Sequence, residues 1–253
     1  MKEVLTSCKK QNILFQKRLI ANMREASMSR LYQDKPVVIF GSGAFAELAA
    51  HVLQFDAKRA VAGFTVDAEY IKSNSLAGRK IVAFEDASRL FPSDTHEMIL
   101  PLGYSKINQT RMNRMNQAKA MGYKIINFIS TYAIISEGVD FSENTLIYEQ
   151  AILQAHVKVG TNVIVRAGAN IGHHSRIGDH SFIASNVVTG GNVTIGEFCF
   201  VGLGAVLRDS VKLGDRSFVG AGAVLISDTE PDSVYVGNPA RRTAKTSLEV
   251  TNG

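Results

Sequence analysis

Large apolar residues follow a six-residue repeat through the C-terminal half of the chain. From Ile135 to Leu225 one stands at every sixth position, and Thr189 is the only exception. The positions are Ile135, Phe141, Ile147, Leu153, Val159, Val165, Ile171, Ile177, Ile183, Thr189, Ile195, Val201, Leu207, Leu213, Val219 and Leu225. Glycine often comes next, and a small or β-branched residue stands four positions after the apolar one. A repeat held in register over this length predicts a repetitive architecture.

The period of the repeat identifies its secondary structure. A helical repeat needs a period near 3.6 residues, which a strict six does not provide. Short parallel strands that coil about a common interior fit the pattern, with the large apolar residue inside. The small residue and the glycine then permit the chain to turn at each corner. The sequence therefore predicts a β-solenoid.

The preceding segment, from Pro36 to about Tyr123, has a different pattern. A β-branched run at 37–40 ends in Gly41, Ser42 and Gly43, and residues 44–54 have apolar positions at helical spacing. Further strands are expected near 60–64, 80–84 and 98–102, and the clearest helix over 106–121. Strands alternating with helices predict a small parallel sheet with crossover connections.

Composition narrows the function classes. Of 253 residues, 45% are hydrophobic and 20% charged, with two cysteines that lack metal-ligand spacing. This cysteine usage favours a reducing compartment, and we expect a cytoplasmic protein with no membrane span. The net charge of +5 comes from scattered Lys and Arg, without the basic face and interleaved aromatics of a nucleic-acid binder. Residues 1–34 are basic, lack a signal-peptide core and are expected to form a peripheral helix or tail.

The repeat resembles that of the left-handed β-helix acyltransferases. The ending Val234–Arg241 looks like their closing segment, and with the Gly-rich N-terminal unit the span is similar to sialic-acid O-acetyltransferase-like enzymes and their relatives that N-acetylate UDP-linked amino sugars. The resemblance implies left-handed coils of three hexads, a homotrimer, acetyl-CoA as acyl donor and a nucleotide-linked sugar acceptor in bacterial lipopolysaccharide or capsule biosynthesis. It divides the chain into an extension (1–34), a Rossmann-like nucleotide-sugar-binding domain (35–128), the β-helix (129–242) and a tail (243–253).

Acyl transfer from a thioester requires a base that deprotonates the acceptor, and histidine is suited to this near neutral pH. The family has its catalytic histidine two positions after an interior aliphatic residue, which in this chain is His173, after Ile171. The family often has Asp or Glu next, where this chain has His174. Stacking of coils about 4.8 Å apart would place His156 beside His174 and Asn162 beside His180.

A histidine cluster on such a fold also raises the question of metal binding. Hexapeptide-type carbonic anhydrases bind zinc through histidines of which two are five residues apart. The histidines of this chain have no such spacing. We therefore expect no metal.

The resemblance also implies the residues that contact ligands. For coenzyme A these are Gly191, Leu203, Ala221 and Arg241, whereas Phe182 replaces a histidine that contacts the cofactor in the family. For the acceptor they are Gly41, Ser42 and Gly43, where a helix N-terminus favours phosphate, together with Asp67, Tyr104 and Arg166.

The leading hypothesis is an acetyl-CoA-dependent N-acetyltransferase that acts on a nucleotide-linked amino sugar, with His173 as general base. Three alternatives stay open. These are O-acetylation of a sugar hydroxyl of the sialic-acid type, a metal-binding lyase of the carbonic-anhydrase type, and a non-catalytic trimer that binds nucleotide sugars.

Overall fold

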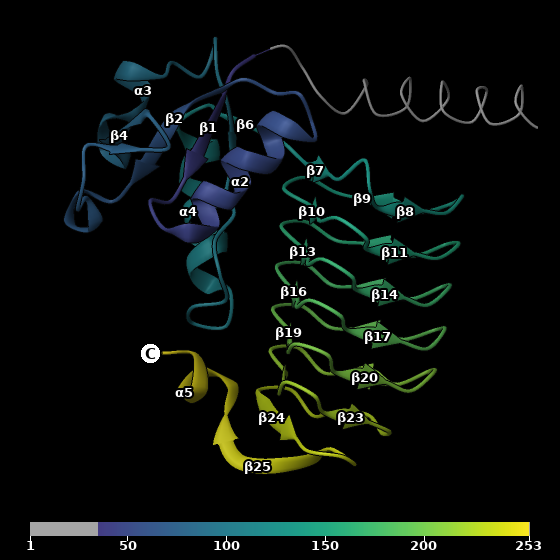
Figure 1. Cartoon of the computed structure of the whole chain (residues 1–253). Helices are drawn as coiled ribbons and strands as arrows, with labels where there is room; N and C mark the ends of the chain where they lie inside the picture. The colour runs from purple at the N-terminus through teal and green to yellow at the C-terminus, as the bar shows by residue number, and fades with distance from the viewer. Residues whose placement is uncertain (1–34, 253) are drawn as a thin grey trace, which may run out of the picture. The chain divides into compact units, whose positions relative to one another are not determined.

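The computed structural model describes residues 35–252 (Figure 1), and the extension at 1–34 lies outside this range. From Lys35 onward the chain forms one compact unit, in which a parallel sheet with its helices packs against a parallel β-helix. The sequence prediction of a Rossmann-like unit followed by a left-handed β-helix of hexapeptide repeats is confirmed. No helix in the described range is long and apolar enough to span a membrane.

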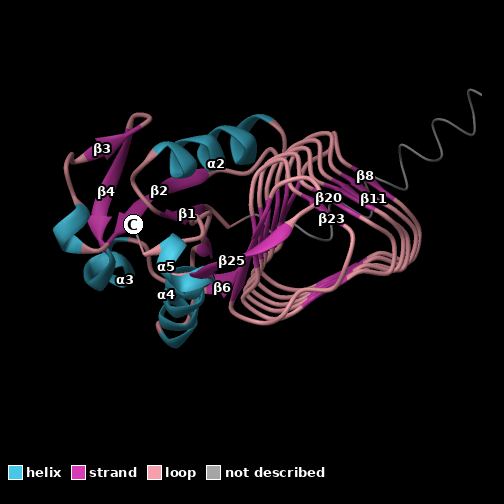
Figure 2. Ribbon diagram, turned by 90° about the horizontal axis from the view of Figure 1, so that it is seen from below, coloured by secondary structure: helices cyan, strands magenta, loops and turns pink. Residues whose placement is uncertain are grey.

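The N-terminal unit has a sheet of strand order β3-β4-β2-β1-β5-β6, parallel except for the β3–β4 pair. Its elements are β1 (Val37–Phe40), α2 (Ala44–Phe55), β2 (Val61–Val66), β3 (Ser75–Leu76), β4 (Arg79–Ala83), α3 (Ala87–Leu90), β5 (Glu97–Ile99), α4 (Gln109–Ala120) and β6 (Lys124–Ile125). Short 3-10 turns occur at Ala68–Tyr70 and Phe84–Asp86. Figure 2 shows α2 and α4 on opposite faces of this sheet. Because β1 is fully buried between β2 and β5, its carboxyl end opens where the strand order reverses.

Helix α4 differs from its prediction. The pattern predicted a helix from residue 106, but α4 begins at Gln109. Lys106, Ile107 and Asn108 instead have positive φ values of 50°, 45° and 67°. Left-handed backbone costs about 1–2 kcal/mol per non-glycine residue, so tertiary contacts must hold this turn.

The β-helix consists of two-residue strands from β7 (Phe128–Ile129) to β23 (Val224–Leu225), arranged in three parallel sheets. We name each sheet by one strand: the β16 sheet (β7, β10, β13, β16, β19, β22, β24 and β25), the β14 sheet (β8, β11, β14, β17, β20 and β23) and the β15 sheet (β9, β12, β15, β18 and β21). Seen along its axis, the coil is a three-sided prism with the N-terminal unit beside one side (Figure 2). Ile164 pairs with Phe182 and Phe182 with Phe200, so each coil has eighteen residues (182 − 164 = 200 − 182).

Strand bounds follow the hexads. They are β8 (Ile134–Ile135), β9 (Asp140–Phe141), β10 (Leu146–Ile147), β11 (Ile152–Leu153), β12 (Lys158–Val159), β13 (Ile164–Val165), β14 (Asn170–Ile171), β15 (Arg176–Ile177), β16 (Phe182–Ile183), β17 (Val188–Thr189), β18 (Thr194–Ile195), β19 (Phe200–Val201), β20 (Val206–Leu207), β21 (Lys212–Leu213) and β22 (Phe218–Val219). The second residue of each strand from β10 on is buried, as the repeat predicted. The corners turn through left-handed residues, among them His156, His174 and His180.

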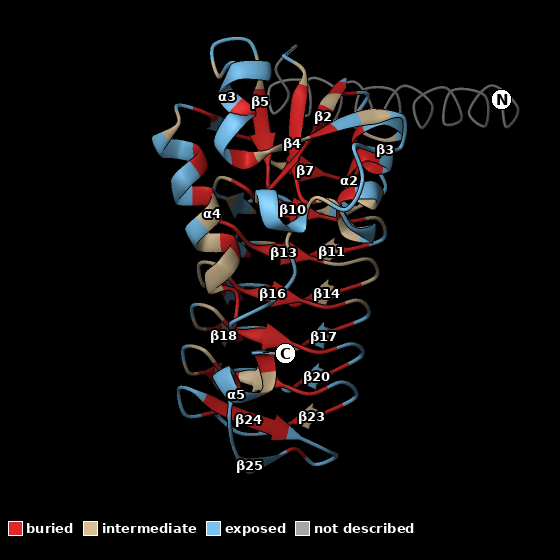
Figure 3. Cartoon of the chain, turned by 90° about the vertical axis from the view of Figure 1, so that its left-hand side faces the viewer, coloured by how far each residue is buried: buried red, intermediate tan, exposed pale blue. Residues whose placement is uncertain are grey.

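The chain ends in ordered structure. Strand β24 (Ser233–Val236) pairs antiparallel with β25 (Arg241–Thr246), and α5 (Ser247–Thr251) follows. Residues 243–252, predicted as a tail, therefore form the end of β25 and a short helix. Figure 3 shows α5 on the same side of the molecule as α4.

Candidate functional site

The histidine corner, which we define as His156, His173 and His174, lies where the chain passes from the β14 sheet to the β15 sheet. His173 and His174 follow the buried Ile171 and are exposed. Gly172 is required between them, because a Cβ there would lie 2.1 Å from the carbonyl oxygen of Gly190 in the next coil. Close stacking of the coils therefore determines where the His173 side chain leaves the backbone.

The two adjacent imidazoles hydrogen-bond to each other. His173 Nδ1 lies 3.1 Å from His174 Nδ1, and the rings are nearly perpendicular at 85°. Since one nitrogen donates and the other accepts, the pair shares one proton between its Nδ1 atoms. Nε2 of His173 makes no hydrogen bond within residues 35–252 and is left for chemistry. No carboxylate of the described chain bonds to either ring.

Gly191 forms the wall beside the His173 ring. A Cβ at position 191 would lie 2.5 Å from His173 Cε1 and 2.6 Å from Nε2, so the ring lies directly over the backbone of the next coil. The Gly191 amide makes no hydrogen bond to any residue that the structure describes. Of the predicted cofactor residues, Gly191 is the one that the structure brings to His173.

His156 lies in the preceding coil and covers the other side of His174. Their ring centroids are 4.8 Å apart, and Asn162 Nδ2 lies 2.9 Å from His180 Nδ1. Both neighbour pairs expected from coil stacking are therefore present. The described residues contain no group of three or more His, Cys, Asp or Glu side chains arranged to hold a metal ion.

The remaining predicted cofactor residues lie elsewhere. Leu203 and Ala221 stack on adjacent coils at the corner between the β16 and β14 sheets, and Leu203 is 59% exposed. Arg241 is exposed on β25. The β14 sheet thus has Gly191 at one edge and Leu203 and Ala221 at the other.

The predicted acceptor residues gather around the carboxyl ends of β1, β2 and β5. Gly41 ends β1 with a φ of 126°, and Gly43 precedes the first residue of α2 without a side-chain cap. An added Cβ on Gly43 would meet nothing within 4 Å. The first amides of α2 thus begin at an open loop, a site suited to a phosphate.

Asp67 follows β2 and pairs with Arg114 of α4, whose Nη2 lies 2.6 Å from Oδ2. Desolvation by burial raises the pKa of Asp67, against the opposing effect of Arg114. The pairing orients the carboxylate at the edge of the loop, and it uses an arginine that the sequence had not identified.

Tyr104 lies on a ladder of aromatic rings on the outer face of the β16 sheet. Its centroid is 4.0 Å from Phe200 and 5.8 Å from Phe182, and the rings of Phe200 and Phe218 stack at 4.6 Å. Phe182 is buried here and also lies 6.2 Å from Phe45 of α2. It therefore faces the N-terminal unit and not the histidine corner.

Arg166 completes this group. Its guanidinium lies 4.6 Å from the Phe45 ring centroid and 4.1 Å from that of Tyr148. Its Nη1 is buried without a hydrogen-bond partner among the described residues. Burial raises the pKa of Tyr148 to about 12, so the phenol beside Arg166 is neutral at pH 7. No ion pair balances the Arg166 charge within residues 35–252.

Arg111 and Asn108 are structural residues that the sequence gave no means of finding. Arg111 is fully buried and donates to the carbonyls of Leu102 (3.2 Å), Gly103 (2.9 Å) and His180 (2.6 Å). Burial lowers its pKa to about 9, and it remains charged at neutral pH. Asn108 donates to the carbonyls of Phe198 and Cys199. The two side chains join the start of α4 to a corner of the β-helix.

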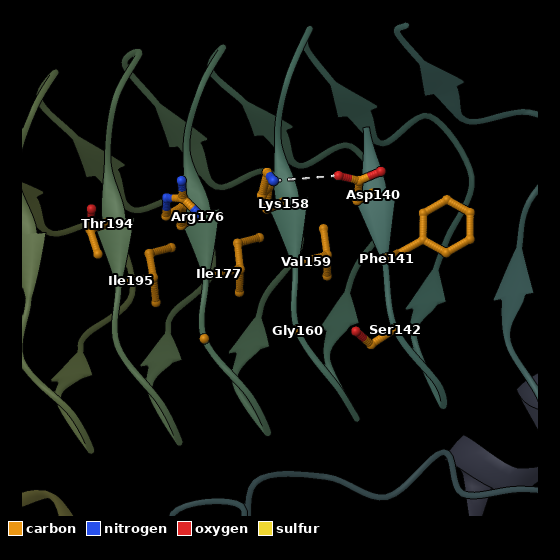
Figure 4. A pocket seen from close by; sticks show the side chains of 11 residues that line it. Asp140, Phe141, Ser142, Lys158, Val159, Gly160, Arg176, Ile177, Thr194 and Ile195 are labelled. Atoms are coloured by element: carbon orange, nitrogen blue, oxygen red, sulfur yellow. Dashed lines mark ion pairs between the residues drawn. The ribbon is translucent and has the colours of Figure 1, made fainter. Parts of the chain in front are cut away.

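A shallow hollow lies on the β15 sheet, away from all predicted site residues (Figure 4). Asp140, Lys158 and Arg176 lie in line across it, and Lys158 Nζ is 3.6 Å from Asp140 Oδ2. Its floor is the apolar interior of the coil. The hollow brings no group of catalytic type together.

Comparison with known proteins agrees with the fold. A family model described as the hexapeptide repeat of succinyl-transferase matches residues 192–227. The chain is similar to perosamine N-acetyltransferase from Caulobacter crescentus, solved with CoA and GDP-perosamine (24% identity, TM-score 0.75, covering 83% of this chain and 97% of that one). It has the fold of the left-handed β-helix acyltransferases.

Two further structures have this fold. The acetyltransferase domain of PglB from Neisseria gonorrhoeae, solved with acetyl coenzyme A, has 21% identity and a TM-score of 0.75, covering 83% of this chain and 100% of that one. WeeI from Acinetobacter baumannii has 20% identity and a TM-score of 0.75, covering 82% and 99%. No curated protein matches the chain by sequence.

On this acyltransferase fold, the two groups of predicted residues lie on different sides of the coil. The acceptor group contacts the β16 sheet, through Tyr104 and Phe45. The histidine corner joins the other two sheets and is therefore opposite the β16 sheet. Within one chain the coil separates them.

Proposed function

We propose that the protein is an acetyl-CoA-dependent N-acetyltransferase that acts on a nucleotide-linked amino sugar, with His173 as general base. The observation that carries the proposal is the geometry of His173. Its ring is exposed, its Nδ1 is bonded to His174, and its Nε2 is free beside the Gly191 backbone. The solved structures of this fold bind CoA and GDP-perosamine or acetyl coenzyme A, which supports the same donor and acceptor class.

The chemistry follows from these groups. The amine nitrogen of the acceptor attacks the thioester carbonyl while His173 Nε2 takes its proton. The carbonyl becomes an oxyanion, and the unpaired Gly191 amide is the donor closest to the His173 ring that is placed to stabilise it. Collapse breaks the C–S bond, and the departing thiolate takes the proton from the His173 imidazolium. The products are an N-acetylated sugar and free coenzyme A.

His174 replaces the acidic neighbour of the family pattern. As a neutral acceptor it fixes which nitrogen of His173 carries hydrogen, and so leaves Nε2 as the base. It supplies no negative charge to stabilise the imidazolium. We therefore expect His174 to orient the base more than it strengthens it.

The proposed enzyme is a homotrimer. The outer face of the β14 sheet exposes apolar side chains in successive coils, including Ile134 (50%), Val188 (42%) and Val206 (40%). In a closed ring of three copies, one edge of this sheet meets the opposite edge of the neighbour's. Such a ring would join the Gly191 edge to the Leu203 and Ala221 edge, and would give the histidine corner an acceptor held by another subunit.

The coenzyme A groove would then lie between subunits, with Gly191, Leu203 and Ala221 along it and Arg241 near its phosphates. Gly41, Ser42, Gly43, Asp67, Tyr104 and Arg166 would hold the nucleotide-linked sugar. We expect a cytoplasmic enzyme of bacterial lipopolysaccharide or capsule biosynthesis. A free, buried Cys199 and the absence of any disulfide in the described chain are compatible with a reducing compartment.

O-acetylation of a sugar hydroxyl is the second candidate, and Arg166 favours it. An unpaired guanidinium among the acceptor residues disfavours a protonated amine nearby, whereas a neutral hydroxyl meets no such repulsion. Nucleotide-linked amino sugars and the corresponding hydroxyl sugars, assayed side by side, distinguish the two activities.

The test is release of free coenzyme A from acetyl-CoA with UDP-, GDP- and dTDP-linked amino sugars and with free sugars. Wild type is compared with His173→Asn, and His51→Asn, an exposed histidine on α2, is the matched control. We expect turnover in wild type and the control, and a loss of about 10²–10⁴-fold in His173→Asn. If no acceptor in the panel releases coenzyme A from wild type, the proposal is wrong. If His173→Asn is fully active, only the assignment of the base fails.

The trimer has its own test. Val188→Glu places a charge on the exposed apolar face, and Phe55→Glu, on the exposed surface of α2, is the control (Phe55 is 62% exposed). We expect Val188→Glu to convert the trimer to a folded monomer without activity. An active wild-type monomer in light scattering would contradict the trimeric site.

A further inference from the structure

The loop of residues 103–108, between β5 and α4, carries Tyr104 and has a turn of unusual backbone. Lys106, Ile107 and Asn108 are left-handed in succession, and none is glycine. Such a turn persists only where its surroundings determine it. The described structure shows contacts to this loop from two parts of the chain that are distant in sequence.

One side of the loop is held by the β-helix. Arg111 donates to the carbonyls of Leu102 and Gly103, and Asn108 donates to the carbonyl of Phe198 at 3.1 Å. Tyr104 lies on Phe200 between these contacts. These bonds fix the two ends of the loop and leave the backbone amides of its middle to another partner.

That partner is the C-terminal helix α5. The Lys106 amide donates to the Thr251 carbonyl at 3.0 Å, and the Ile107 amide donates to Thr251 Oγ1 at 2.9 Å. Ile107 and Thr251 are both buried, with 1% and 4% exposure. Helix α5 is itself secured by a capping box of Thr246 and Glu249 and by a bond from the Ser247 amide to the Asp232 carbonyl. Figures 1 and 3 both show α5 close to the loop that precedes α4.

We propose that the C-terminal helix positions the acceptor-binding loop, with Thr251 as the positioning residue. Two consecutive amides of the strained turn end on this residue, so its hydroxyl and carbonyl set the path of the backbone that carries Tyr104. The inference rests on the proposed function in one respect, namely that the 103–108 loop meets the nucleotide-linked sugar. Thr251 touches neither substrate and acts through the loop.

The experiment compares Thr251→Val, which removes the hydroxyl at similar volume, with Thr251→Ser, which retains it. Thr243→Val is the control, because Thr243 lies on β25 and its hydroxyl accepts only from the nearby Lys245 amide. Three quantities are measured on the full chain. They are hydrogen exchange of residues 103–108, the KM for acceptor against the KM for acetyl-CoA, and the binding of UDP, GDP and dTDP by calorimetry.

We expect Thr251→Val to speed exchange in the loop and to raise the acceptor KM, or the nucleotide Kd, about tenfold, with the acetyl-CoA KM unchanged. Thr251→Ser should restore wild-type values and Thr243→Val should not depart from them. If Thr251→Val does not fold, Thr246→Ala removes the exposed cap of α5 and should shift the same quantities less.

Unchanged loop exchange, or equal rises in both KM values, would overturn the proposal. The failure of the proposed function is a separate outcome. If wild type releases no coenzyme A with any acceptor but binds a nucleotide, the exchange and calorimetry still decide the role of Thr251. If wild type binds none of the nucleotides, the loop is not an acceptor loop and the positioning proposal fails with it.

Discussion

Replacing Gly191 by alanine tests how strictly the fold positions its proposed base. The new Cβ would lie 2.5 Å from His173 Cε1, whereas ordinary contact begins at 3.4 Å, so the ring must move by about 0.9 Å (3.4 − 2.5). The neighbour is an exposed ring and not backbone, so it can move. Stability should therefore change little, and the cost should appear in catalysis.

The displacement has a calculable consequence. A misplacement of about 1 Å at a reacting group costs on the order of 10²-fold in rate, which corresponds to about 2.7 kcal/mol in the activation free energy. The same movement lengthens the 3.1 Å bond between His173 and His174. We therefore expect the kcat of Gly191→Ala to fall about 100-fold, while the midpoint of thermal unfolding stays within a few degrees of wild type.

The assay is coenzyme A release with the best acceptor of the panel, on the single variants and on Gly191→Ala combined with His173→Asn. If the alanine acts by moving the ring, the double variant should be no slower than His173→Asn alone. Additive losses would refute the reasoning, because they would show that Gly191 matters through another contact. Full kcat in Gly191→Ala would refute the predicted position of the ring.

Three further predictions concern His174, His180 and Arg111. His174→Asp should retain or raise kcat, since Asp tolerates the left-handed backbone (φ 59°) and a carboxylate stabilises the His173 imidazolium; a fall as large as in His174→Ala would contradict this. Burial, with a contribution from Arg111, lowers the pKa of His180, so the unfolded chain binds the extra proton first and stability should fall as pH drops below about 6.5. His180→Asn should flatten that dependence in thermal unfolding followed from pH 7 to pH 5, and an unchanged slope would count against His180 as its source. Arg111→Leu removes the donor to several buried carbonyls and should lower the free energy of unfolding by about 3 kcal/mol or more in urea titrations, whereas a loss under 1 kcal/mol would show that water replaces the guanidinium.

The β-helix was predictable because each hexad meets the same local requirement. Ile171 and Ile177 must fill an interior of constant width, and Gly172 must pass within contact distance of the next coil's backbone. These constraints recur with the coil and appear in the sequence as a period. The position of His173 follows directly, because its phase in the hexad puts it at a corner.

Tertiary contacts determine what the sequence did not reveal. The start of α4 was placed three residues too early because Lys106–Asn108 reads as helix, and only Thr251 and the β-helix hold it left-handed. Arg111 stands on a polar helix with no pattern that marks it as buried. Phe182 was read only as a lost cofactor contact, and its actual packing against Tyr104 depends on how the N-terminal unit meets the coil.

Charge connects the departures from the family pattern. His174 contributes an imidazole where the family often has a carboxylate, and Arg166 has no acidic partner in the described chain, so both expected halves of the site lack the negative charge that would balance them. A substrate with phosphate groups supplies that charge on binding, and it does so next to the amides at the start of α2. Free amino sugars lack it. We therefore expect the preference for a nucleotide-linked over a free sugar to weaken as ionic strength rises, since screening acts on the charged acceptor alone.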